Sequence, residues 1–390
     1  MALGLPSISI KFIQEGITAI SRGSRGIVAM IIKEEKAISP ATIVDVTDIP
    51  SDVTDNNKQL ITNALIGNTS APLRLELYII SGELTLQDAL SYFENTQFDY
   101  LCYPSAVDED KTAIVTWIKS QRNLGNMVKA VLANETADYE GIINVTQSGV
   151  VVGEKTYTAA EFTARVAGLI AGTDLRMSTT YTSVPEVDLI PYESRTETTE
   201  KVGKGEFILY KESGRIKVAR GVNSLTTVSD TTVTDIQSKG DLFQKIKTVD
   251  IMDLIANDIR KTARDAYIGK LSNSYDNKVL LITAIHGYFD GLINDGLVEK
   301  NTVTVDIDME EQKKYLKSNG VNISNMSDQQ IKEANTGDQV FIAVECKILD
   351  AIESISIRCF IWCHWNKKSD ALYNICLLYT SPSPRDRSVS

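Results

Sequence analysis

Alternating hydrophobic and polar positions mark the two ends of the chain. A period of two over 7–12 and again over 354–361 predicts β-strands that bury one face. The hydrophobic positions of these strands include Ile8, Ile10, Phe12, Ile355 and Ile357. A glycine-containing link over 16–26 separates the first strand from the following sequence. Neither strand has a local partner, so each is expected to be an exposed edge unless another chain pairs with it.

Between these ends, short apolar runs alternate with amphipathic stretches of helical period. The apolar runs predict strands at 27–33, 73–80, 98–103, 127–132 and 142–145. The amphipathic stretches predict helices at 54–66, 85–93, 108–121 and 158–171. Thr158 and Glu161 are spaced as in a capping box at the start of the last of these helices. Strands that alternate with helices predict βαβ units and an open α/β sheet.

The remainder of the chain is predicted to be more helical. Hairpins are expected around Gly153 and Gly214, and a polar surface loop over 223–239. The expected helices lie at 243–268, 277–293, 310–318 and 327–333, with strands at 303–307 and two more within 340–361. The ordered chain is therefore expected to begin and end with an alternating strand.

Composition narrows the class of protein. Among the 390 residues, 43% are hydrophobic and 23% are charged, as in soluble globular proteins of two or three domains. The net charge of -11 argues against a nucleic-acid partner, because phosphate binding needs a basic surface. No apolar run reaches the roughly 18 residues of a membrane span, and no secretion signal is expected. A single early cysteine, Cys102, suits a reducing cytoplasm.

Candidate catalytic chemistry is sparse. The two histidines are His286 and His364, and neither a Gly-x-Ser-x-Gly elbow nor a Walker-type phosphate loop occurs. A Ser-His-Asp arrangement stays open from sequence alone, so an α/β hydrolase is the alternative function. A candidate zinc site is formed by Cys359, Cys363, His364 and Cys376. Residues 362–390, however, resemble translated sequencing-adapter DNA and are expected to be a non-native tail. We therefore expect that the chain has no catalytic residue, cofactor or metal site and that it is not an enzyme.

Several sequence runs are similar to one known family. They are GLPSI at 4–8, VAGLIAGT at 166–173, IKVARGVNSLT at 216–226, DIR at 258–260, YIGK at 267–270, NSYDNK at 273–278 and EANTG at 333–337. In this order they resemble the contractile tail sheath family of phages and R-type bacteriocins, especially its short clostridial and bacillar type. The resemblance covers about 1–361. The sequence departs from the family pattern at Glu353-Ser354 and at Arg358-Cys359-Phe360.

The resemblance implies a fold of several parts. The implied fold class is a multidomain α/β protein whose open α/β core is subtilisin-like without protease chemistry. A strand arm and link are then expected at 1–24, a small N-terminal α/β domain at 25–95, and the subtilisin-like domain at 96–245. A helical α+β C-terminal domain with a terminal strand arm is expected at 246–361.

The resemblance also implies a function and partners. Sheath subunits form stacked hexameric rings that wind helically around a tail tube, and contract from a metastable extended state to drive the tube through a target cell envelope. The implied partners are tail tube, baseplate and tail terminator proteins. Assembly would occur in the bacterial host cytoplasm, before release as a virion tail or bacteriocin particle. Neighbouring subunits would share their terminal strands, while glycine-containing links let the bodies rotate.

Basic residues on the predicted helix 243–268 are candidates for contact with the tube. They are Lys245, Lys247, Arg260, Lys261 and Arg264. A solvated helix face also explains these residues, so both explanations stay open from the sequence. A tube subunit or an adhesin is a further self-assembling alternative, but tube subunits are usually shorter and dominated by strands.

Overall fold

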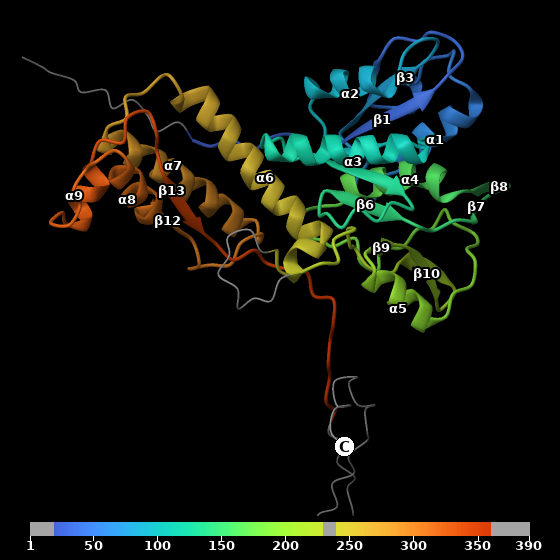
Figure 1. Cartoon of the computed structure of the whole chain (residues 1–390). Helices are drawn as coiled ribbons and strands as arrows, with labels where there is room; N and C mark the ends of the chain where they lie inside the picture. The colour runs from blue at the N-terminus through green and yellow to red at the C-terminus, as the bar shows by residue number, and fades with distance from the viewer. Residues whose placement is uncertain (1–18, 229–238, 360–390) are drawn as a thin grey trace, which may run out of the picture. The chain divides into compact units, whose positions relative to one another are not determined.

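The computed structural model describes residues 19–228 and 239–359 (Figure 1). The chain up to Ala351 belongs to one compact unit, and Ile352 begins a second one. In the first unit a seven-stranded sheet with covering helices is followed by a mainly helical part. In the second unit the described residues 352–359 form neither helix nor strand.

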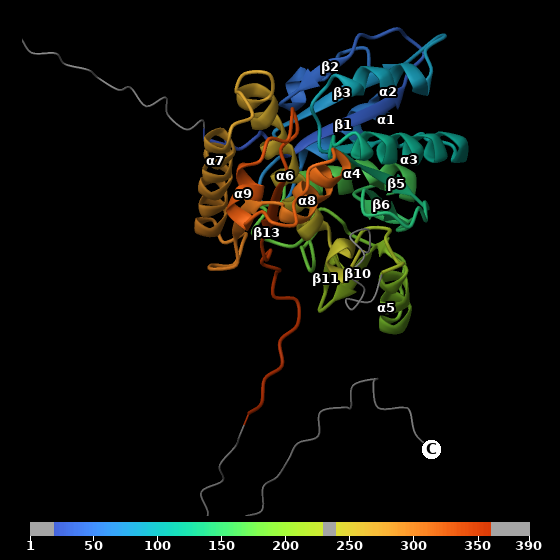
Figure 2. The same ribbon diagram turned by 60° about the vertical axis from the view of Figure 1, so that its left-hand side comes forward.

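The large sheet has the strand order β2-β3-β1-β4-β5-β6-β9. Every neighbouring pair is parallel except β2 and β3. Figure 2 shows β1 and β3 side by side, with β2 at the edge. The strands are β1 (Ile27–Lys33), β2 (Ala41–Ile43), β3 (Arg74–Ile80), β4 (Tyr100–Cys102), β5 (Lys129–Ala133), β6 (Ile142–Val145) and β9 (Glu206–Phe207). Parallel pairing agrees with the predicted βαβ units, because parallel neighbours need crossover connections.

Helices cover both faces of this sheet. They are α1 (Asp55–Leu65), α2 (Leu86–Glu94), α3 (Asp108–Asn123) and α4 (Ala159–Ala171). β1 turns Val28 and Met30 into the core formed with α1 and α4, and Ile27 and Ile31 into the core formed with α2 and α3. A strand buried on both faces reads as a continuous apolar run, which explains the sequence of β1.

The start of α4 confirms the predicted capping box. The Thr158 N–H donates to the Glu161 carboxylate at 3.0 Å, and the Glu161 N–H donates to the Thr158 hydroxyl at 3.2 Å. Further along, a Cβ on Gly168 would lie 1.8 Å from the carbonyl oxygen of Ala64 in α1, so the two helices touch backbone to backbone. This close contact fixes α4 across β1, β4, β5 and β6.

Smaller elements complete the α/β part. A 3₁₀ turn, η1 (Val46–Asp48), follows β2, and α5 (Arg195–Gly203) precedes β9. The two predicted hairpins are present as β7 (Val150–Val152) with β8 (Lys155–Tyr157), and β10 (Leu209–Glu212) with β11 (Arg215–Val218). The polar loop expected over 223–239 is buried at its start, because Asn223, Ser224 and Leu225 are at most 4% exposed.

The mainly helical part has its own hydrophobic core. Its elements are η2 (Asp241–Gln244), α6 (Ile246–Thr262), a π-helical turn (Ala263–Tyr267), α7 (Tyr275–Asn294), β12 (Thr304–Ile307), α8 (Met309–Ser318), α9 (Asp328–Glu333) and β13 (Ile342–Glu345). β12 and β13 pair in antiparallel fashion. Ile285, Phe289 and Leu292 of α7 lie in the core, where they meet Ile251 and Leu254 of α6. Within the described ranges, no helix is long and apolar enough to cross a membrane.

The single chain differs from the sequence predictions in two places. The small domain expected at 25–95 is not separate from 96–245, because β1 pairs with both β3 and β4 in one sheet. Residues 354–359, part of the strand expected over 354–361, have no regular structure in the single chain, where no partner strand is present. Pairing of this segment with a strand of another copy stays a prediction. The sequence pattern also fails to predict α5, which buries no residue and has no apolar stripe. The strand expected over 7–12 and the tail 362–390 lie outside the described residues.

Candidate functional site at the root of the N-terminal arm

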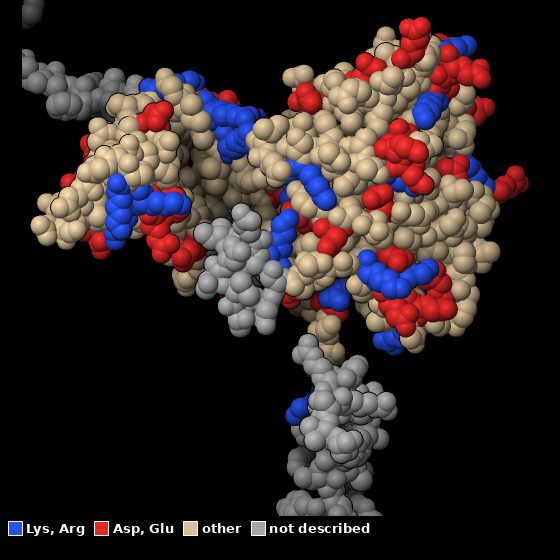
Figure 3. Space-filling model, viewed as in Figure 1, with Lys and Arg blue, Asp and Glu red and all other residues tan. Residues whose placement is uncertain are grey.

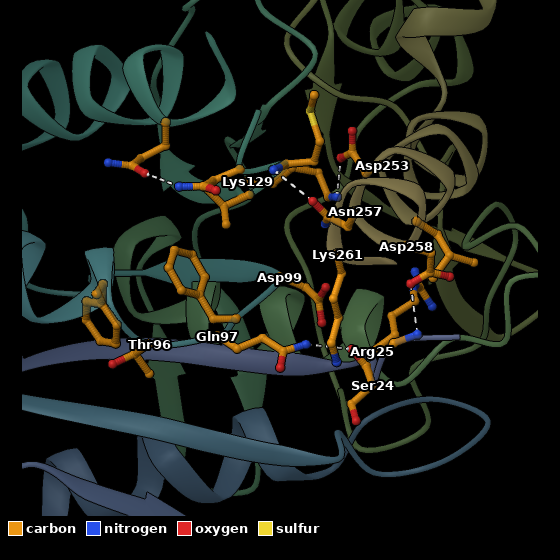
Figure 4. A pocket seen from close by; sticks show the side chains of 18 of the residues that line it. Ser24, Arg25, Thr96, Gln97, Asp99, Lys129, Asp253, Asn257, Asp258 and Lys261 are labelled. Carbon is orange, nitrogen blue, oxygen red and sulfur yellow. Dashed lines mark hydrogen bonds and ion pairs between the residues drawn. The ribbon is translucent and has the colours of Figure 1, made fainter. Parts of the chain in front are cut away.

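Residues 23–27, here called the N-terminal root, lead from the first segment of the chain into β1. The Gly23 N–H donates to the Oδ1 of Asp258 on α6 at 2.8 Å. The Gln97 side chain donates to the Ser24 carbonyl at 3.1 Å. Figure 4 shows these residues converging from α6 and from the loop that precedes β4. The root is therefore held by groups that are distant in sequence.

Asp258 joins the N-terminal root to two helices. It lies on α6, and its Oδ2 accepts a hydrogen bond from the Tyr288 hydroxyl of α7 at 2.8 Å. The residue is only 2% exposed. Burial raises the pKa of Asp258 above its ordinary value, although the hydrogen bonds from Gly23 and Tyr288 oppose the rise. A buried carboxylate held mainly by neutral donors thus fastens the beginning of the root.

Asp99 holds the other end of the N-terminal root. Its Oδ2 accepts hydrogen bonds from the N–H groups of Gly26 at 2.7 Å and Ile27 at 2.8 Å. Burial raises the pKa of Asp99, while the Ile27 hydrogen bond and the charges of Lys129 and Arg25 oppose the rise. The two N–H groups are satisfied at the point where the chain enters the sheet, as buried backbone donors must be.

Arg25 is the charged anchor of the root. Its guanidinium pairs with Asp250 of α6 and donates to the Thr173 carbonyl at 3.0 Å. The Tyr100 hydroxyl of β4 donates to the other oxygen of Asp250. Burial alone lowers the pKa of Arg25, but Asp250, Tyr100 and Asp99 outweigh burial, so the pKa ends above its ordinary value. The guanidinium therefore stays charged although it is buried, because the fold places acidic groups around it.

Asp250 and Asp253, one turn apart on α6, share buried cations from the sheet and its helices. Lys129 of β5 lies 3.1 Å from Asp250 and 2.6 Å from Asp253. Arg122 of α3 donates twice to Asp253, at 2.8 and 2.9 Å. Burial lowers the pKa of Lys129, but Asp253 and Asp250 outweigh it and raise the pKa. Because removal of one partner leaves an uncompensated buried charge, this cluster fixes α6 against the sheet.

The two glycines of the root permit close approach. A Cβ on Gly23 would lie 2.9 Å from the Oδ1 of Asp258, and one on Gly26 would lie 2.8 Å from the Ala171 carbonyl oxygen. Gly26 also has a φ of +84°, which residues with a side chain rarely adopt. The structure thus fixes residues 23–26, where the sequence suggested a flexible link.

A cavity of about 280 Å³ with both polar and apolar walls lies between the N-terminal root, the loop before β4 and α6 (Figure 4). Its walls include Thr96, Asn126, Asn257 and Lys261. Among the described residues, no group of three or more His, Cys, Asp and Glu side chains is arranged to hold a metal ion. The chemistry around the cavity is hydrogen bonding and ion pairing, which suits mechanical attachment of the root.

Sequence reasoning misses the carboxylates of α6. Asp250, Asp253 and Asp258 interrupt the helix whose apolar stripe alone was expected to be buried. The sequence does contain a signal for the burial of these carboxylates. Apolar residues are so frequent over 246–254 that few positions remain for a solvent-exposed face of the helix. Their partners Arg25, Lys129 and Arg122 come from elements that only the fold brings together.

The five basic residues expected near a tube do not form one set. Lys245, the residue before α6, pairs with Asp350, and Lys247 is only 7% exposed. Arg260 and Lys261 lie at the opposite end of α6, which is 17 residues long and therefore spans roughly 25 Å. Arg264 lies in the π-helical turn that follows. Lys245 and Lys247 thus belong to a different part of the molecule from the other three.

At the C-terminal end of α6, Lys261 and Arg264 are exposed. Lys261 lines the cavity, and Arg260 lies with its guanidinium against Gly125. Burial and the neighbouring charge of Arg264 lower the pKa of Arg260. The basic group at this end of α6 is therefore compact.

Surface charges of both signs are interspersed elsewhere. Figure 3 shows basic side chains beside acidic ones across the face in view. Ion pairs such as Lys201 with Glu193 and Lys332 with Asp306, each at 2.5 Å, also place opposite charges side by side. Mixed charges produce a weaker long-range field than a surface of one sign.

The hydrophobic residues predicted for the two terminal strands fall into two groups. Ile8, Ile10 and Phe12 lie outside the described residues. Ile355 and Ile357 are described and are 77% and 75% exposed. Both isoleucines present their side chains to solvent in the described chain.

His286 does not assemble a catalytic arrangement. It is exposed on α7, and its side chain makes no hydrogen bond or ion pair within the described part of the chain. His364 lies outside that part. The geometry around His286 gives no support to a serine hydrolase, which needs a base in contact with its nucleophile.

Two known domain families, both from one kind of protein, match successive parts of the sequence. Residues 81–224 match the phage tail sheath protein central domain, and residues 238–361 match the phage tail sheath C-terminal domain. Together these matches cover well over half of the chain. Their border, between 224 and 238, lies just before the helical part that begins with η2.

Known proteins agree with this assignment. The chain is 41% identical over 362 residues to the tail sheath protein of Clostridium phage phiCD119, with 91% of this chain and 99% of the relative covered. Its fold is similar to the sheath tail protein of Desulfitobacterium hafniense, with a TM-score of 0.65 at 22% identity over 77% of this chain and 94% of that one. It is also similar to the helical sheath of the anti-feeding prophage in its contracted state, with a TM-score of 0.66 at 12% identity over 92% and 99% of the two chains. From the matched domains and the 41% identical relative, the chain belongs to the phage tail sheath family.

Proposed function

We propose that this chain polymerises into a helical sheath around a tail tube and contracts to drive the tube through the envelope of a target cell. Membership of the tail sheath family carries this proposal. The fold similarity to a sheath described in its contracted state supports it. The extended sheath would be a kinetically trapped assembly that relaxes when it is triggered.

Shared terminal strands are the proposed connection between neighbouring subunits. Ile352, Ile355 and Ile357 are 86%, 77% and 75% exposed in a segment without regular structure. Exposed isoleucines on unpaired backbone are unfavourable in water, and they fit a strand that completes the sheet of another copy. In the described chain β12 and β13 form a two-stranded sheet, so each of them is an edge strand. The strand expected over 7–12 is the second shared element.

The proposed assembly consists of stacked hexameric rings. Head-to-tail strand sharing is a heterologous contact, and such contacts propagate into helical tubes. The fold is also similar to a chain in the six-fold symmetrised baseplate of the anti-feeding prophage, with a TM-score of 0.61 at 14% identity. The proposed partners are a tail tube protein, baseplate proteins and a tail terminator. Assembly would occur in the bacterial host cytoplasm, before release in a virion tail or bacteriocin particle.

Two finer features are part of the same proposal. The α/β core is expected to be subtilisin-like without protease chemistry, as the family resemblance implies. The C-terminal domain is expected to line the tube, with Lys261 and Arg264 as candidate contacts because both are exposed. An acidic tube surface would be attracted to these cations during encounter.

The α/β hydrolase alternative has no support. The relative and the solved structures described above are sheath proteins. His286 is exposed, and its side chain makes no hydrogen bond or ion pair in the described chain. A structural role therefore remains the function that the observations support.

Expression of residues 1–361, alone and together with the tube protein of the same particle, tests the proposed function. We expect tubules in negative-stain electron micrographs, with a filled lumen when the tube protein is present. The His286→Ala variant is the matched control and should assemble as well as the original chain. A well-folded protein that stays monomeric under both conditions would contradict the proposal.

A further inference from the structure

The chain has a second root, where it leaves the compact unit toward 352–359. The Glu299 N–H donates to the Lys347 carbonyl, and the Leu349 N–H donates to the Leu297 carbonyl, both at 2.9 Å. Asp350 follows directly, and its carboxylate pairs with the ammonium group of Lys245. We call residues 347–350 the C-terminal root. Its last side chain is therefore held by the residue that immediately precedes α6.

The same helix holds the N-terminal root. Asp250 of α6 pairs with Arg25, and Asp258 of α6 accepts the hydrogen bond from Gly23. Lys245 and Asp258 are about 20 Å apart along a helix that rises 1.5 Å per residue. Both ends of the compact unit are thus attached to different points of one helix.

The packing of α6 makes it suited to transmit a displacement. Its first turns are buried nearly all round, with Ile246 in the core of the large sheet and Ile251 and Leu254 in the core of the helical part. The ion pairs of Asp250 and Asp253 add fixed contacts to the sheet. Packed interiors do not deform continuously, so a shift at one end of such a helix changes the contacts at its other end.

We infer that α6 is a strut that couples the two arms of one subunit. A pull on the C-terminal arm acts through Asp350 and Lys245 on α6, and α6 carries the change to Gly23 through Asp258. This inference rests on the proposed function only in assigning the arms to neighbouring subunits, since the coupling itself belongs to the single chain. In a sheath, it would transmit strain from the arm on one side of a subunit to the arm on the other.

Hydrogen exchange of the soluble chain, followed by mass spectrometry, tests the strut. The Lys245→Glu variant breaks the pair at the C-terminal root, and Asp258→Ala breaks the contact at the N-terminal root. Coupling between sites is reciprocal, with typical effects of about fivefold or more. We expect Lys245→Glu to speed exchange in peptides that cover 23–27 by about that factor, and Asp258→Ala to speed exchange in peptides that cover 347–350.

Three further variants separate coupling from general destabilisation. Asp350→Lys alone should act like Lys245→Glu, and the double variant Lys245→Glu with Asp350→Lys should restore slow exchange at 23–27. Lys36→Glu is the matched charge reversal, because Lys36 forms an exposed pair with Asp52 at 3.1 Å, apart from both roots. It should leave both peptides unchanged. Exchange that rises only at the root that carries the substitution would overturn the inference.

Tubule formation by the unsubstituted chain is measured in parallel. Absence of tubules would count against the proposed function and leave the exchange result to decide the strut. Tubules formed by a chain whose roots respond independently would overturn the strut and leave the sheath function intact. Both results are read from the full chain.

Discussion

The backbone N–H of Gly23 donates a hydrogen bond to the Asp258 carboxylate at 2.8 Å, across 235 positions of the sequence. A glycine in a link usually suggests freedom of rotation. Here the absence of a Cβ instead lets the backbone approach a buried carboxylate. The chain is therefore fixed at Gly23, and Ile20 just before it also packs in the core of the helical part.

Gly23→Ala should weaken this attachment. The new Cβ would lie 2.9 Å from the Oδ1 of Asp258, so either the root or the carboxylate must shift. We expect a loss of about 1–3 kcal/mol in the free energy of unfolding, from overpacking and a lengthened hydrogen bond. Gly287→Ala on α7 is the matched control, because nothing lies within 4 Å of its added Cβ. It should stabilise the chain by about 1 kcal/mol, as expected within a helix. Urea unfolding of both variants measures the difference.

Local patterns predict most elements of the fold but not their attachments. The continuous apolar run at 27–33 and the capping box of Thr158 and Glu161 identify β1 and α4, because both signals lie within one element. The contact of Gly23 with Asp258 depends on tertiary structure, and no local period encodes it. The alternation at 354–361 describes a strand face correctly only if another copy supplies the partner, so the single chain leaves 354–359 without a strand.

Loss of Asp253 should destabilise the body strongly. Its carboxylate compensates Arg122 and Lys129, and all three side chains are at most 8% exposed. Asp253→Asn leaves buried positive charge without its partner, which typically costs about 3–5 kcal/mol. Asp52→Asn removes the partner of Lys36 in an exposed pair, and should cost less than about 1 kcal/mol. Equal losses in chemical unfolding would show that the buried cluster does not fix α6.

Asp258 should make stability depend on pH with a defined sign. Burial raises its pKa above the ordinary value of 3.8, so the folded chain binds this proton more tightly than the unfolded chain. In the window from 3.8 up to the raised value, unfolding therefore releases a proton and stability falls as pH rises. Asp258→Asn lacks this titration. We expect the unfolding free energy of the original chain, relative to the variant, to fall as pH rises through that window.

A second variant checks the origin of the pH dependence. The Tyr288 hydroxyl donates to Asp258 at 2.8 Å and opposes the rise of its pKa. Tyr288→Phe should therefore raise the pKa further and extend the window toward higher pH. Chemical unfolding at a series of pH values compares the three proteins. A flat difference between the original chain and Asp258→Asn would contradict the assignment.

Removal of residues 1–18 should separate folding from assembly. Ile20 is only 8% exposed and packs in the core of the helical part. The shortened chain begins at residue 19, so it retains this core residue. We expect an unfolding free energy close to that of the full chain and no tubules in electron micrographs. A chain that begins at residue 23 also loses Ile20, and should lose about 2–4 kcal/mol through an emptied core position. Tubules of normal length from the chain that begins at 19 would disprove N-terminal strand sharing.

Substitutions on the two faces of 354–357 test the C-terminal strand. Ile355 and Ile357 are exposed in the single chain, so Ile355→Asp and Ile357→Asp should change the unfolding free energy by less than about 0.5 kcal/mol. In a shared sheet these side chains would face the core of a neighbouring copy, where an unpaired carboxylate is costly. Tubule formation should therefore fail.

Ser354→Asp and Ser356→Asp place the same charge on the opposite face of the expected strand, because side chains alternate along it. These two variants should keep both stability and tubules. If the serine variants and the isoleucine variants assembled equally well in sedimentation and electron microscopy, 354–357 would not be a strand with one buried face. If all four failed, net charge rather than the orientation of the side chain would explain the loss. Only failure confined to the isoleucine positions fits a strand inserted into the next subunit.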